Sequence, residues 1–242
     1  MTLPDLASQI VYSRIGWAIV AATVACALWR GAAPLSRTGV GAIMAGALAL
    51  MALPGNLSPA WYLGLAFQYP SGLLVGCCLV RLTERWNGAR RSGAMPPSLA
   101  GVLAVAGTLL YLDAVGFLTS GYYYAGFGGV LTPVVAVIMA GACALAIVRH
   151  HARGIAAAVL GAVALYSVLR LPSGNLWDAL LDPLLFGWAI AVLLAGALRR
   201  TRRRVADRSP ASDGDPEPAA GPALQPIAAE HFTSLKEQVG GQ

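Results

Sequence analysis

Charged residues are scarce in this sequence. Only 12% of its 242 residues are Asp, Glu, Lys or Arg, whereas 57% are hydrophobic. Soluble domains contain about a quarter charged residues. One of the 17 basic residues is a lysine, Lys236, and it lies near the C-terminus outside every apolar segment. A retinal Schiff base, which needs a lysine within a membrane span, is therefore excluded, and the composition predicts a membrane protein.

Residues that carry common enzyme chemistry are also scarce. The histidines (His150, His151 and His231) lie outside the apolar segments, which argues against intramembrane haem ligands and removes the usual general base of a hydrolase. The four cysteines form no Cys-x-x-Cys pair and are expected to behave as small apolar residues. The sequence also lacks a P-loop and a Gly-x-Ser-x-Gly elbow. We therefore expect no cofactor and no metal, and an enzyme is disfavoured.

Long apolar segments are abundant. About 20 mostly apolar residues are needed to cross a hydrocarbon core roughly 30 Å thick. Segments close to this length recur along the chain and predict an all-α bundle of seven transmembrane helices. Their ranges are 10–29, 38–54, 61–80, 98–118, 127–148, 154–170 and 179–198.

Arginines follow every second segment. They occur in the loops after the first, third, fifth and seventh spans, whereas the loops after the second and fourth spans are uncharged. The positive-inside rule then predicts a periplasmic N-terminus and a cytoplasmic C-terminus in the inner membrane. This distribution indicates that the net charge of +6 orients the chain in the lipid bilayer and does not serve to bind a nucleic acid. The basic residues of these loops are Arg30, Arg37, Arg81, Arg85, Arg90, Arg91, Arg149, Arg153, Arg199, Arg200, Arg202, Arg203 and Arg204.

The last part of the chain differs in composition. Residues 205–242 are rich in Pro, Ala, Asp and Glu and have too little apolar surface to fold alone. They predict a disordered cytoplasmic tail after a transmembrane domain of residues 1–204.

An internal duplication is also predicted. A shift of 119 residues aligns the tripeptide that contains Asn56 with the one that contains Asn175 (both Gly-Asn-Leu), and it aligns Arg81 with Arg200. The repeats would cover 10–85 and 129–204, with span 98–118 as the linker. Units of this kind would point in the same direction across the membrane, as the parallel repeats of some transporters do.

Charged residues within spans are the main candidates for function, because a charge in lipid is costly. We predict an outward-facing vestibule in which Asp113 and Asp182 bind a cation or proton, with Asp178 one helical turn before Asp182. Arg14 or Arg170 would supply the counter-charge. The alternative is that these side chains reach the headgroup level or pair structurally.

The matched asparagines are further candidates. Asn56 and Asn175 would bind polar solutes, or they would cap turns, because Gly-Asn sequences are common in turns.

Three functions remain open from the sequence. The first is a permease or channel for a small solute. The second is an accessory or assembly subunit that binds other membrane proteins or a second copy of itself. The third is a membrane-embedded enzyme acting on a lipid or a lipid-linked substrate.

Overall fold

The computed structural model describes residues 4–29, 35–88, 95–128, 131–150 and 152–208, and all regular secondary structure in these ranges is helical. The chain forms two compact units, residues 1–198 and 199–242. Helix α10 continues to Arg208, so residues 205–208 of the predicted tail are helical. The rest of that tail lies outside the described residues. Every site discussed below belongs to the first unit.

Among the described residues, three helices are long and apolar enough to cross a membrane. They are α1 (Leu6–Leu28), α5 (Pro97–Ala114) and the Pro183–Arg203 part of α10 (Pro183–Arg208). The prediction of a helical membrane protein is confirmed at this level. Shorter apolar helices coincide with three further predicted spans, namely α2 (Arg37–Met51), α7 (Leu131–Val148) and α8 (Arg153–Leu169). The count of seven spans is not confirmed.

The third predicted span is broken. A continuous helix over 61–80 was expected, but the chain forms α3 (Pro59–Phe67) and α4 (Gly72–Trp86) with a non-helical segment between them. Pro70 lacks the N–H that a helix interior needs, and it disfavours helical geometry in the residue before it. Ser71 then starts α4, because its side chain accepts a hydrogen bond from Leu74 N.

The loops contain short helices that the hydropathy pattern does not predict. A 3-10 turn, η1 (Gly55–Leu57), precedes α3, and α6 (Tyr122–Ala125) follows α5. The short helix α9 (Leu176–Leu180) precedes α10, so the predicted seventh span starts at Pro183 and not at residue 179.

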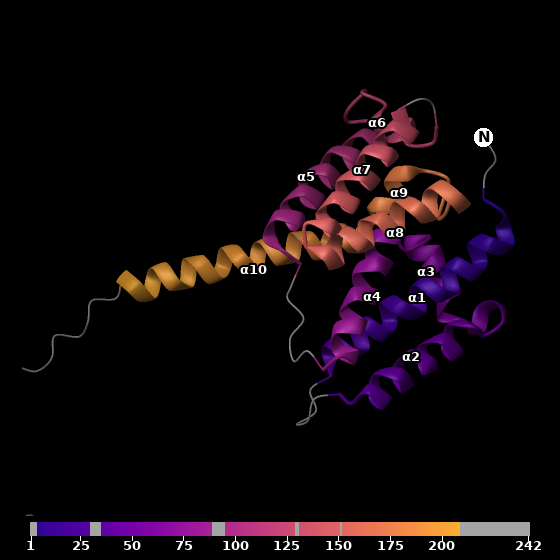
Figure 1. Cartoon of the computed structure of the whole chain (residues 1–242), viewed down its shortest axis with the longest axis horizontal. Helices are drawn as coiled ribbons and strands as arrows, with labels where there is room; N and C mark the ends of the chain where they lie inside the picture. Colours follow the sequence, from indigo (N-terminus) through magenta and orange to yellow (C-terminus); the bar gives the residue numbers. More distant parts are fainter. Residues whose placement is uncertain (1–3, 30–34, 89–94, 129–130, 151, 209–242) are drawn as a thin grey trace, which may run out of the picture. The chain divides into compact units, whose positions relative to one another are not determined.

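Small residues set the closest helix contact. Figure 1 shows α1, α2 and α4 side by side, and α4 also packs against α8. A Cβ atom on Gly76 would lie 2.9 Å from the Cα atom of Ala158, and one on Gly72 would lie 3.0 Å from the Cα atom of Ala162. The two backbones therefore approach as closely as small-residue interfaces in membranes allow.

The duplication is not confirmed. In both proposed repeats the Gly-Asn-Leu tripeptide precedes a short helix and then a longer one. The two asparagines nevertheless have different surroundings, because Asn56 is exposed and Asn175 is completely buried.

Candidate functional site

A cavity lies beside the break in the third predicted span. Its volume is about 620 Å³, and residues of α1, η1 and α3 line it together with Gln68 and Tyr69 of the break. Its walls are largely apolar, with Ile10, Trp61 and Leu65 among them. This size lies within the range of sites for small organic molecules, which are usually apolar with a few polar groups.

Arg14 is the charged side chain of this cavity. It lies on α1, is half-buried and is the one ionic group among the described residues that line the space. Within the described part of the chain, Arg14 has no hydrogen-bond or ion-pair partner. A guanidinium in an apolar helix is costly unless an opposite charge or water meets it. The cavity therefore favours an anion from outside the chain.

The helix break is held against α1. The Tyr12 hydroxyl donates a hydrogen bond of 2.7 Å to the carbonyl oxygen of Pro70. Gly16 lies one turn further along α1, and a Cβ atom there would come 2.7 Å from Pro70 Cγ. At the end of α3, Gln68 has a positive φ of 60°, which is uncommon for a residue other than glycine. The break is thus a fixed feature of the fold beside the Arg14 cavity.

Asp182 joins the N-terminal ends of two helices. Its carboxylate accepts hydrogen bonds from Leu185 N at 2.7 Å and from Ser71 N at 2.6 Å. The side chain is only 6% exposed. Both amides belong to the first turns of helices, where N–H groups lack partners within the helix and where negative charge is favourable. This geometry favours a structural role for Asp182 over cation or proton binding.

Asp113 also binds the main chain. Its carboxylate accepts hydrogen bonds from Ser120 N, Gly121 N and Tyr123 N at 2.8–3.1 Å, and its side chain is 4% exposed. The residue stands near the end of α5. Ser120 and Gly121 belong to the loop that leads into α6, and Tyr123 belongs to α6. Asp113 therefore attaches this loop to α5, and a structural role is again favoured.

Asp178 and Asn175 hold α6 from the other side. The Tyr123 hydroxyl and the Ser173 hydroxyl both donate to the Asp178 carboxylate. The Asn175 side chain donates to Tyr123 O and accepts from Trp177 N, so it also caps α9. Asp113, Asp178 and Asn175 therefore meet around one residue, Tyr123.

Burial changes the proton affinities of this cluster. Desolvation raises the pKa of Asp178 above its usual value, although the hydrogen bonds from Ser173 and Tyr123 act in the opposite direction. Desolvation and the nearby Asp178 charge raise the pKa of Tyr123 to about 12. Tyr123 thus remains a hydrogen-bond donor over the physiological range.

The raised pKa of Asp178 predicts a pH dependence of stability. The folded chain holds this proton more tightly than the unfolded chain, so stability falls as pH rises from the ordinary pKa of 3.8 through the folded pKa. The midpoint of thermal unfolding in detergent, measured between pH 4 and 7, should fall less steeply in Asp178→Asn. Tyr123→Phe removes a bond that favours the carboxylate, so its slope should be steeper than that of the wild type. Equal slopes in all three proteins would contradict this assignment.

The predicted counter-charges do not pair with the aspartates. Arg170 donates to the Tyr166 hydroxyl at 2.6 Å and lies over the Tyr166 ring. Among the described residues, no ion pair joins Arg14 or Arg170 to Asp113 or Asp182. The predicted vestibule residues therefore do not form one site. Asp113, Asp178 and Asn175 lie around Tyr123, whereas Asp182 binds the starts of α4 and α10. Arg14 lines the cavity, and Asn56 lies exposed in η1.

Sequence reasoning missed Tyr12, Gln68 and Ser71, and it gave Tyr123 no role in binding the acidic candidates. The run Gln68-Tyr69-Pro70-Ser71-Gly72 was the available signal for the break, because proline followed by a capping serine ends one helix and starts another. Tyr123 had no such signal beyond its place in an aromatic run.

Comparisons with protein-family models, curated proteins and solved structures found no match to this chain.

Proposed function

We propose that this protein is a multi-pass inner-membrane permease for a small organic anion, with its outward site at the Arg14 cavity. The supporting observation is an arginine of an apolar helix that lines a cavity of about 620 Å³ without a partner in the described chain. An anion would supply the missing charge, and the apolar walls would hold the rest of the solute. The carrier would keep the orientation predicted by the arginine loops, with the cavity in the periplasmic half.

The broken helix supports transport over simple binding. Discontinuous helices are common in transporters, where the ends of half-helices and the backbone between them form solute sites. Here Gln68 and Tyr69 of the break line the same cavity as Arg14. A solute in this cavity would therefore contact the segment between the two half-helices as well as Arg14.

Uptake into proteoliposomes tests the proposal. Permanently charged sulfonates, such as benzenesulfonate and hexanesulfonate, are suitable probes because they cross bare lipid poorly. The wild type should take them up, and Arg14→Gln should reduce the rate at least about tenfold, as expected for removal of the one charged contact. Trimethylphenylammonium, a cation of similar size, should not be transported.

Arg149→Gln is the matched control. Arg149 is exposed and does not line the cavity, so its loss removes the same charge without changing the site. Sulfonate uptake that is equal in the wild type and Arg14→Gln would overturn the proposal. So would faster uptake of the cation than of the anions.

An accessory subunit is the second candidate. Helix α8 has an exposed face of small residues, Ala157, Gly161 and Ala164, spaced so that they share one side of the helix. No atom would lie within 4 Å of a Cβ added to Gly161. A neighbouring helix would pack closely on this face. Absence of uptake, together with a stoichiometric second polypeptide in the purified protein, would favour this function over the permease.

A further inference from the structure

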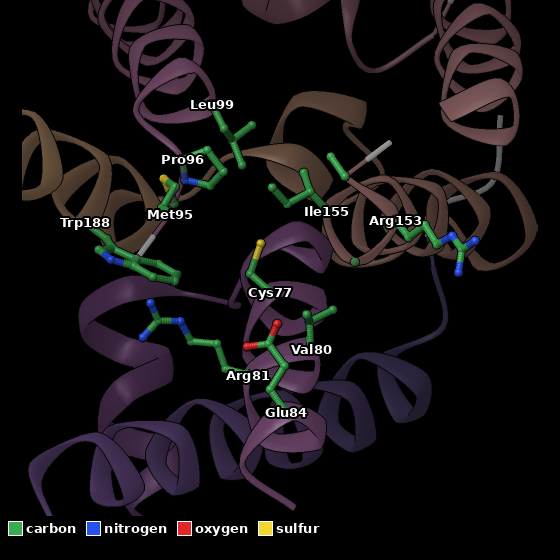
Figure 2. A pocket seen from close by; sticks show the side chains of 12 residues that line it. Cys77, Val80, Arg81, Glu84, Met95, Pro96, Leu99, Arg153, Ile155 and Trp188 are labelled. Atoms are coloured by element: carbon green, nitrogen blue, oxygen red, sulfur yellow. The ribbon is translucent and has the colours of Figure 1, made fainter. Parts of the chain in front are cut away.

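A second cavity lies at the opposite end of α4 from the break. Its volume is about 290 Å³, and its lining comes from α4, α8, α10 and the start of α5. Figure 2 shows the sulfur of Cys77 directed into it, with Leu99 and Ile155 on the far side. The space would hold about ten waters. It is therefore larger than an ion site and smaller than a whole lipid.

The charged groups of this cavity stand at its edge. The guanidinium of Arg81 lies over the Trp188 ring, 5.0 Å from its centroid, and this cation–π contact helps to hold it in place. Glu84 follows one turn later on α4 (Figure 2). Arg153 belongs to the opposite rim, and Figure 2 shows its guanidinium directed outward. Arg81, Arg153 and Glu84 are thus the charged residues of the rim within the described part of the chain.

Apolar groups form most of the remaining wall. Val80, Met95, Leu99 and Ile155 are among them. A surface groove along α5 begins at Pro97, next to the cavity residue Pro96, and continues over exposed apolar side chains. Val102 and Val105 of this groove are 65% and 64% exposed. The groove would offer further apolar surface to an acyl chain that leaves the cavity at the start of α5.

We infer that this cavity binds an anionic phospholipid, with the phosphate at the Arg81 rim and part of an acyl chain among Val80, Leu99 and Ile155. The guanidinium of Arg81 supplies positive charge for a phosphate at this rim, and Arg153 lies on the opposite rim. Arg81 on α4 and Arg153 at the start of α8 belong to the basic segments predicted to be cytoplasmic. Basic pockets between helices on that side are typical sites for anionic headgroups. Trp188 suits the same depth, since tryptophan is enriched at the headgroup level. This inference does not depend on the transport proposal.

Lipid titration of the purified full-length protein tests the site. Phosphatidylglycerol, added to the protein in a neutral detergent, should raise the thermal unfolding midpoint, whereas phosphatidylcholine should raise it less. The apparent affinity for phosphatidylglycerol should fall about fivefold in Arg81→Gln, the effect of one basic residue near a headgroup. Arg149→Gln removes an exposed arginine outside the cavity and should leave the affinity unchanged.

Two further variants separate the cavity from general attraction to a basic surface. Glu84→Gln removes the negative rim charge and should strengthen phosphatidylglycerol binding, a gain that mere damage to the fold would not produce. Cys77→Phe keeps both arginines but fills the cavity, so it should weaken binding of the intact lipid. Glycerol phosphate, which has the headgroup chemistry without chains, should stabilise the wild type much less. Equal loss in Arg81→Gln and Arg149→Gln, no gain in Glu84→Gln, or equal stabilisation by glycerol phosphate would overturn the inference.

Discussion

Replacement of Gly126 with alanine is expected to destabilise the protein by about 3 kcal/mol or more, the upper part of the range for overpacking in a filled site. A Cβ atom at this position would come closer than 3.0 Å to Asn175 Oδ1 and to the Trp177 ring. Asn175 is completely buried, so its side chain has no solvent to move into. The new methyl group would therefore displace the hydrogen bonds that Asn175 makes to Tyr123 O and Trp177 N.

The expected effect is steric and not conformational. Gly126 has φ of −68° and ψ of −19°, values that alanine adopts readily. Its carbonyl also accepts hydrogen bonds from Leu176 N and the Tyr166 hydroxyl, so movement of the backbone would disturb α8 and α9 as well. Neither the neighbouring side chains nor the backbone of Gly126 can move to relieve the clash without breaking hydrogen bonds.

Thermal unfolding in detergent, followed with a thiol-reactive dye, measures this effect. Cys26 and Cys78 are buried in the folded protein, so their reaction with the dye reports unfolding. Gly141→Ala is the control, since no atom lies within 4 Å of a Cβ added at this exposed position. An unfolding midpoint for Gly126→Ala equal to that of Gly141→Ala would show that the packing around Asn175 is looser than described.

Hydropathy predicted a helical protein, because a chain in lipid must pair every backbone amide and carbonyl within the protein. An α-helix does so within a single segment. Hydropathy placed α1, α2, α5, α7 and α8 within a few residues, but it joined α3 to α4. A window of about twenty residues averages over one proline, and the segments 61–67 and 72–80 on both sides of the break are largely apolar or aromatic. The local rule for proline therefore outweighed the hydrophobic pattern at this point.

Asp113 and Asp182 are buried, and their hydrogen-bond partners were not foreseeable from the sequence. The position of a carboxylate within a predicted span indicates that it needs a partner. It does not tell whether this partner is a bound cation or a main-chain amide. The amides that bind Asp182 and Asp113 come from a helix break and from a loop whose shapes are set by distant residues. Ser71 lies 111 positions from Asp182 in the sequence, and no local pattern connects the two.

The candidate residues thus divide by whether the chain supplies their partners. Asp113, Asp178 and Asp182 each accept at least two hydrogen bonds from groups of the protein. Arg14 has no such partner among the described residues, and it lines a cavity. Arg14 is therefore a stronger candidate for solute binding than the three aspartates that the sequence analysis selected.

Asp182→Ala should cost about 3–5 kcal/mol of stability, because two buried N–H groups lose their acceptor and each unsatisfied donor costs about 1–3 kcal/mol. The alanine would leave Ser71 N and Leu185 N without an acceptor at the starts of α4 and α10. Water cannot replace the carboxylate easily, since Ser71 is completely buried and Asp182 itself is 6% exposed. Asp182→Asn keeps one oxygen acceptor, so it should retain the cap on one helix and lose about half as much.

Asp5→Ala provides the matched control for this prediction. Asp5 also caps a helix, accepting from Ser8 N at 3.4 Å, but it is exposed and holds only α1. Its loss should cost about 1 kcal/mol or less, because water can satisfy the freed amide. The same dye assay compares the three variants. An Asp182→Ala midpoint near that of Asp5→Ala would show that α4 and α10 do not depend on a shared carboxylate, whereas the order Asp5→Ala, Asp182→Asn, Asp182→Ala would establish that dependence.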